Sequence, residues 1–116
     1  MPDFTYRGRR YHNPVELALD QLGGHWKMPI LWRLRDGHVL RYGELRQSLA
    51  HCTDNMLATQ LRELERDGYL RRTAYAEVPP RVEYALTPLG QRVLPIVETL
   101  RQFGQALIDA EALAGR

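Results

Sequence analysis

The sequence predicts a mainly α-helical fold with one small β-hairpin, and three observations lead to this prediction. Asn13-Pro14 and Thr87-Pro88 each combine a capping side chain with a proline at the first helical position. Apolar residues recur with helical spacing through most of the chain between these signals. Two strand-like segments, LRRTAY and RVEYAL, flank the loop AEVPP, whose prolines exclude one continuous strand.

Length and composition indicate one folded domain. The chain has 116 residues, of which 44% are hydrophobic and 26% are charged, as is ordinary for a globular protein. No apolar run approaches the roughly 18 to 20 residues that a membrane helix needs. The single cysteine, Cys52, excludes an internal disulfide and fits a reducing compartment. We therefore expect a cytoplasmic protein that does not enter a membrane.

Caps, glycines and apolar spacing predict five helices, over about 13–22, 26–36, 42–49, 53–68 and 88–113. Residues 1–12 show no periodicity, and 6–12 hold three arginines and no acid. We expect a flexible, extended basic arm over 1–12, a second unit over 13–87, and a C-terminal helix of the same domain over 88–116.

The order of these elements is that of a winged helix-turn-helix, which predicts that residues 13–87 are a DNA-binding unit. A four-residue turn at 50–53 joins two short helices, and the hairpin at about 69–75 and 82–87 follows the second of them. In such folds the second helix of the pair enters the major groove of DNA. The hairpin then lies along the DNA backbone or in the minor groove.

The predicted helix over 53–68 has an apolar face and a polar face. Leu57, Leu61 and Leu64 recur at helical spacing and are expected to pack inward. The opposite face carries groups that hydrogen-bond to base edges or phosphates. A solvated helix face without function has a similar pattern, and that alternative stays open here. The predicted DNA contacts on this segment are Thr53, Asn55, Thr59, Arg62 and Arg66.

Further arginines lie around the predicted hairpin. Fifteen of the 16 basic residues are arginine, the side chain suited to clamp phosphates and to read guanine. The two prolines stiffen the loop, so less entropy is lost on binding. A purely structural hairpin and a codon bias toward arginine are the alternatives. The predicted DNA contacts here are Arg41, Arg71, Arg72 and Arg81.

The last helix carries an apolar stripe that is too long for its own chain to cover. About 25 residues at ~1.5 Å each make a rod of roughly 38 Å, whereas a domain of this size has a radius of gyration of about 13 Å. A second subunit related by two-fold symmetry would cover the remainder and present two reading helices to a palindrome. Residues 88–116 are therefore predicted to be a C-terminal dimerisation helix. The predicted homodimer interface is Val15, Leu19, Leu89, Val93, Ile96, Val97, Leu100, Phe103 and Leu107.

Four segments together resemble the HxlR-type bacterial transcriptional regulators, which are related in fold to the MarR group. They are GGHWKMPILWRL, RYGELRQSL, MLATQLRELERDGYL and PPRVEYALTPLG, in the same order. The resemblance runs from about Asn13 to Phe103. It implies a dimeric winged helix-turn-helix that binds double-stranded DNA, represses or activates a nearby promoter, and catalyses no reaction.

The chain departs from the family's pattern at three positions. Many members have a cysteine where this chain has Asn13, and that thiol is the sensor in members that respond to oxidants or electrophiles. His25 and Asn55 stand where lysine is common. The resemblance therefore carries over neither the sensing cysteine nor an operator sequence. It leaves open whether the controlling signal is a small-molecule effector or a redox signal.

Other chemistry has no support in the sequence. The four histidines have no metal-ligand spacing, and a single cysteine argues against a zinc site. Without a nucleophile, paired-carboxylate or phosphate-loop motif, we expect no enzyme activity, metal or cofactor. Cys52, just before the predicted reading helix, is interpreted as a small, partly buried filler. The alternative function is a winged helix that binds another protein without sequence-specific DNA binding.

Overall fold

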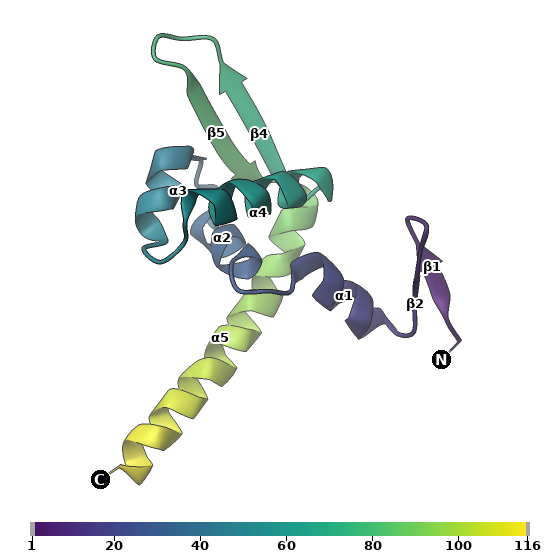
Figure 1. The fold of residues 1–116 in the computed structure, drawn as a ribbon. Helices are drawn as coiled ribbons and strands as arrows, with labels where there is room; N and C mark the ends of the chain where they lie inside the picture. Colours follow the sequence, from purple (N-terminus) through teal and green to yellow (C-terminus); the bar gives the residue numbers. More distant parts are fainter. Residues whose placement is uncertain (1, 116) are drawn as a thin grey trace.

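The computed structural model describes residues 2–115, in which it contains five helices and two small antiparallel sheets (Figure 1). This confirms the predicted mainly α-helical fold with a hairpin. In chain order the elements are β1 (Phe4–Tyr6), β2 (Arg9–Tyr11), α1 (Pro14–Leu22), α2 (Lys27–Arg33), β3 (Leu40–Arg41), α3 (Tyr42–Ser48), α4 (Asp54–Arg66), β4 (Leu70–Tyr75), β5 (Arg81–Leu86) and α5 (Pro88–Ala114).

The three-stranded sheet has the order β3-β5-β4, with β5 in the centre. The register pairs Leu70 with Leu86 and Tyr75 with Arg81, so the two long strands of the hairpin match along their whole length. Strand β3 adds to the other edge, where Leu40 pairs with Tyr84. Figure 1 shows the hairpin projecting beyond the helices, at the end of the molecule opposite the C-terminus.

The apolar core lies where α2, α3 and α4 meet the base of the sheet. The three leucines predicted to face inward from α4 are each at most 2% exposed. They pack with apolar side chains of α2, α3 and β4, and the members of this core include Ile30, Leu31, Leu34, Leu45, Leu49, Tyr69, Leu70 and Tyr84. The helical spacing read from the sequence therefore identified the buried face of α4 correctly.

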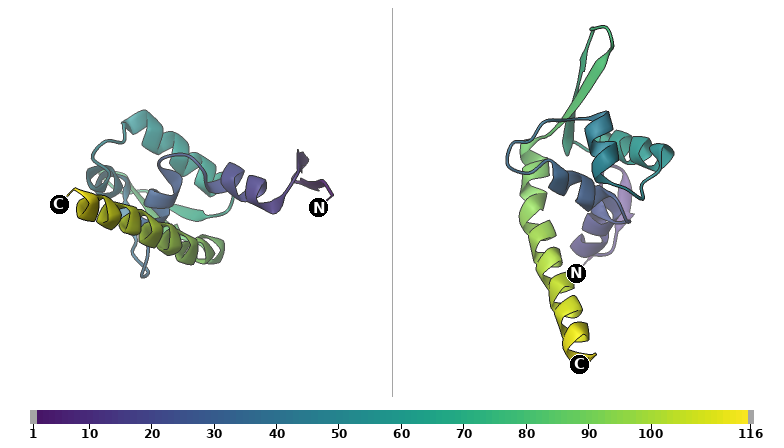
Figure 2. Two further views of the ribbon diagram at one scale, coloured as in Figure 1. Left: turned by 90° about the horizontal axis from the view of Figure 1, so that it is seen from below. Right: turned by 90° about the vertical axis from the view of Figure 1, so that its left-hand side faces the viewer.

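Helix α5 joins this core only through its first turns. A Cβ atom at Gly90 would overlap the carbonyl oxygen of Tyr69, so α5 can approach this closely only with glycine there. Val93 is 3% exposed, whereas Phe103 is 64% exposed. The helix has 27 residues and is about 40 Å long, and its far end extends away from the body (Figure 2). The division of the chain at residue 88 stays a prediction.

The N-terminal segment differs from the expectation of an extended arm. Strands β1 and β2 pair in an antiparallel hairpin, with Phe4 opposite Tyr11. Both turn residues have positive φ, 48° at Arg7 and 82° at Gly8, as a two-residue hairpin turn requires. Asp20 of α1 holds the hairpin, because its carboxylate accepts bonds from the Tyr11 hydroxyl at 2.6 Å and from the Arg9 guanidinium at 3.0 Å.

Candidate nucleic-acid interface

Helix α4 presents polar side chains on the face opposite its buried leucines. It begins at Thr53, whose Oγ1 accepts the N–H of Met56 at 3.2 Å. Asn55, Thr59 and Arg62 follow on the exposed face. Within residues 2–115, the Arg62 guanidinium donates only to Thr59 Oγ1, at 3.3 Å, and no acid pairs with it. The polar face predicted for this helix is therefore present, and Arg62 on it has no acidic partner within residues 2–115.

Arg66, in the last turn of α4, is held by the residue that follows it. Its Nε and Nη2 donate to the two carboxylate oxygens of Asp67 at 3.0 and 3.1 Å. This hydrogen-bonded carboxylate raises the pKa of Arg66. Arg7 of the N-terminal hairpin approaches the same carboxylate at 3.9 Å. Arg66 therefore offers DNA less uncompensated charge than Arg62 does.

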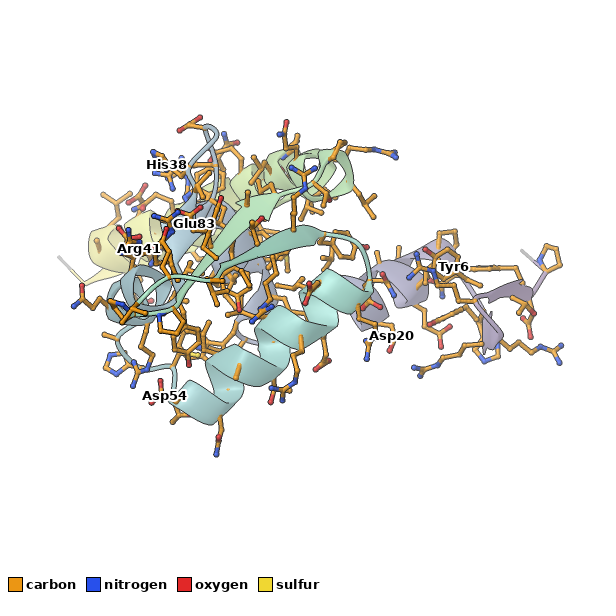
Figure 3. The ribbon with its side chains drawn as sticks, turned by 90° about the horizontal axis from the view of Figure 1, so that it is seen from above. Tyr6, Asp20, His38, Arg41, Asp54 and Glu83 are labelled. Atoms are coloured by element: carbon orange, nitrogen blue, oxygen red, sulfur yellow. The ribbon has the colours of Figure 1, made fainter. Side chains whose placement is uncertain are left out.

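Three side chains that the sequence reasoning missed join α3 to the start of α4. Asp54 Oδ1 accepts from Arg46 Nε at 3.0 Å and from the Tyr42 hydroxyl at 3.1 Å. Burial and this hydrogen bond raise the pKa of Tyr42, so its hydroxyl stays a donor. A carboxylate also suits the positive end of a helix. In Figure 3, α4 runs from Asp54 toward the side where Asp20 and Tyr6 lie.

Strands β4 and β5 with the loop 76–80 form the wing. Arg71 and Arg72 are both exposed on β4, and adjacent residues of a strand point to opposite faces. Arg72 lines a hollow of about 390 Å³ together with Arg62 and Glu65 of α4. Arg72 therefore lies on the side of the wing that faces the polar surface of α4, and Arg71 lies on the other side.

Arg81, which is predicted to contact DNA at the wing, is paired with groups of its own chain. Its side chain is 26% exposed, with the guanidinium stacked over the Tyr75 ring at 4.1 Å from the centroid. Its Nη2 lies 3.3 Å from Glu77, and its Nε lies 3.8 Å from Glu83. The strand register causes this arrangement, because it places Tyr75 directly opposite Arg81. Arg81 is thus paired and stacked within the wing of its own chain.

Arg41 lies between the wing and α3. Its backbone N–H donates to Glu44 Oε1 at 2.8 Å, which satisfies one group at the start of α3. Its side chain is exposed and lines a hollow of about 500 Å³ with Gln47 and the wing prolines. Figure 3 shows Arg41 and Glu83 close together at this end of the sheet. Arg41 is thus near the wing loop rather than on the polar face of α4.

The residues predicted for a dimer interface fall into two groups. Val93 is buried in this chain's own core, and Leu89 and Val97 are half-buried against it, so Val93 cannot contact a partner. The others remain exposed along α1 and α5, at Val15 66%, Leu19 61%, Ile96 50%, Leu100 49%, Phe103 64% and Leu107 57%. These exposed apolar residues lie on two helices, and we refer to them together as the α1/α5 stripe.

Cys52 is more deeply buried than expected, at 1% exposed. Burial raises the pKa of its thiol, which lowers the thiolate fraction and therefore the reactivity. Within residues 2–115, no group of three histidine, cysteine, aspartate or glutamate side chains is placed to hold a metal ion. In the same part of the chain no helix is long and apolar enough to cross a membrane.

Comparison with known proteins identifies a common family. The HxlR-like helix-turn-helix family matches residues 21–112. The HTH-type transcriptional regulator YdeP of Bacillus subtilis is 44% identical over 96 residues, covering 83% of this chain and 74% of YdeP. The redox regulator HypR in its reduced form is 41% identical with a TM-score of 0.79, covering 86% of this chain and 98% of HypR. A MarR-family regulator from Porphyromonas gingivalis is 36% identical with a TM-score of 0.77, covering 84% and 97%.

Proposed function

Since the chain belongs to the HxlR-like helix-turn-helix family of transcriptional regulators, we propose that it binds a palindromic DNA operator as a homodimer. The observation that carries this proposal is the polar face of α4, with its unpaired Arg62 beside the exposed Arg72. In the complex, α4 enters the major groove as the recognition helix. The protein acts in the cytoplasm through binding alone, without enzyme chemistry, metal or cofactor.

Within this interface, each side chain has a role that follows from its chemistry. Asn55 suits adenine and Arg62 suits guanine, since both can form paired hydrogen bonds with these base edges. Arg72, on the wing surface that faces α4, contacts a phosphate next to the groove. Phosphate contacts fix the position of the protein on DNA, and base contacts select the sequence.

The homodimer proposal rests on the α1/α5 stripe. Its side chains are about half exposed or more in the single chain. Apolar surface of this extent on a soluble protein usually marks an interface. A two-fold axis that pairs one stripe with its copy would bury both stripes at once. The same symmetry presents two recognition helices about one DNA turn apart, which is roughly 34 Å.

A small-molecule effector fits the structure better than a redox signal does. Asn13 occupies the position where many family members have a sensing cysteine, and Cys52 is buried with a raised thiol pKa. An open apolar groove of about 490 Å³ lies between α2 and α5, lined by Trp32, Val97 and Leu100 among others. We propose this groove as the place where an effector would act on the dimer.

Selection of bound sequences from a random pool of duplex DNA tests the proposal. We expect one palindromic sequence to be enriched, and it should bind two chains per duplex with higher affinity than a scrambled duplex. Size-exclusion chromatography at micromolar concentration should give twice 13.5 kDa, and a Phe103→Glu variant should elute as a monomer. Enrichment of no sequence would contradict the proposal and favour the alternative, a winged helix that binds another protein.

A further inference from the structure

Lys27 is the one lysine of a chain whose other basic side chains are arginines, and it is buried. It is 5% exposed and occupies the first position of α2. A cation there faces the positive end of the helix dipole. Taking a charge out of water costs several kcal/mol in general, unless it is well paired.

The ion-pair partner of Lys27 is Glu63 of α4, the helix that carries the polar face. Lys27 Nζ donates to Glu63 Oε1 at 3.2 Å, across 36 positions of sequence, and the Glu63 side chain is 31% exposed. Within residues 2–115, this is the only side-chain hydrogen bond that joins α2 directly to α4. The rest of the contact between these helices is apolar packing, which is non-directional. The ion pair is therefore the directional restraint between them.

The position of Glu63 makes this restraint relevant to DNA. Glu63 follows Arg62 immediately on α4 and lies one helical turn after Thr59, so its anchor limits rotation of the helix about its axis. On the other side, α2 lies against the long helix, where Trp32 and Val97 line the same groove. Through Lys27, α2, which packs against α5, is thus linked to the helix that carries the polar face, α4.

We propose that Lys27 and Glu63 are positioning residues for DNA recognition. Their partly buried ion pair sets the rotation of α4, so that Asn55, Thr59 and Arg62 reach base edges together. This inference rests on the proposed function. Neither residue touches DNA itself. Loss of the pair therefore reduces the discrimination between operator and random DNA, because misaligned base contacts are lost while phosphate contacts adjust.

The test compares four variants for stability in urea and for the ratio of operator to scrambled-duplex affinity. Lys27→Met and Glu63→Gln should each lower the ratio about tenfold or more, the discrimination of one good base contact. The double variant Lys27→Met/Glu63→Leu should recover stability, since apolar pairs often replace buried ion pairs well, but should not recover the ratio. The swap Lys27→Glu/Glu63→Lys should recover most of the ratio.

A surface ion pair provides the matched control. Glu98 pairs with Arg101 on α5, so Glu98→Gln should leave the ratio unchanged. If the apolar double variant folds and keeps the full ratio, the pair only fills space and the inference is wrong. The same conclusion follows if the charge-swapped protein folds without regaining the ratio. If the unmodified protein shows no operator preference, the proposed function fails first, and the inference fails with it.

Discussion

Arg62 on helix α4 and Arg81 on the wing are identical side chains with opposite surroundings. Arg62 is exposed, and within residues 2–115 its guanidinium hydrogen-bonds only to the Thr59 hydroxyl, at 3.3 Å. Arg81 stacks on an aromatic ring and lies 3.3 and 3.8 Å from two carboxylates. A cation that is already paired adds less to phosphate binding than a free one. The difference favours α4 over the tip of the wing as the place where this chain offers an uncompensated cation to DNA.

The largest effect on DNA binding is expected at Arg62, because its guanidinium has no acidic partner within residues 2–115. Arg62→Ala should weaken binding to the operator far more than binding to a scrambled duplex, by about 1–3 kcal/mol for each half-site. The physical reason is the loss of paired hydrogen bonds to a base edge, which random DNA does not supply. Titrations of both duplexes at one salt concentration measure this ratio.

Arg10→Ala is the matched control for this prediction. Arg10 is exposed in the N-terminal hairpin, where its Nε donates to Asp3 at 3.1 Å. Its removal takes away the same charge without touching α4, so the ratio of affinities should not change. An unchanged ratio in Arg62→Ala as well would show that the reading face has been assigned wrongly, even if the protein binds DNA.

The sequence predicted α4 well because its determinants are local. The Thr53 cap and the leucine spacing lie within the helix itself, so periodicity was sufficient to find both faces. The bracing of Arg81 could not be read in this way. It depends on the register that sets Tyr75 opposite Arg81 and on the loop that brings Glu77 back toward it. Cross-strand neighbours become known only when the pairing is known.

Two other features escaped prediction for related reasons. The N-terminal hairpin turns at Arg7, which has a φ of 48°, and arginine gives no signal for the left-handed conformation that favours Gly, Asn or Asp. The Lys27–Glu63 pair joins residues 36 positions apart, and a lysine at a helix start gives no indication of burial. Both features depend on tertiary contacts rather than on any short pattern.

An intermediate effect is expected for Arg72. Arg72→Ala should weaken binding to operator and scrambled duplex by similar factors, because a phosphate contact carries no base information. The slope of log affinity against log salt should become shallower by about two units, one phosphate per subunit of a dimer. Titrations at four or more salt concentrations give this slope. A loss confined to the operator would instead place Arg72 at a base edge.

The smallest effect is expected for the wing tip, and a charge-matched variant isolates it. Replacing Arg81 alone leaves Glu77 and Glu83 without their cation, so repulsion from DNA would weaken binding whether or not Arg81 contacts a phosphate. The double variant Arg81→Gln/Glu77→Gln removes one charge of each sign and keeps the net charge of the wing.

If Arg81 braces the wing and does not bind phosphate, the slope of log affinity against log salt should stay within about half a unit of the original. This change is smaller than the value of about 0.9 for one phosphate. Affinity should fall less than about fivefold, because exposed ion pairs and cation–π contacts contribute about 1 kcal/mol or less. A slope reduced by about two units would show that Arg81 leaves its carboxylates to bind phosphate in both subunits, and the contrast between helix and wing would then disappear.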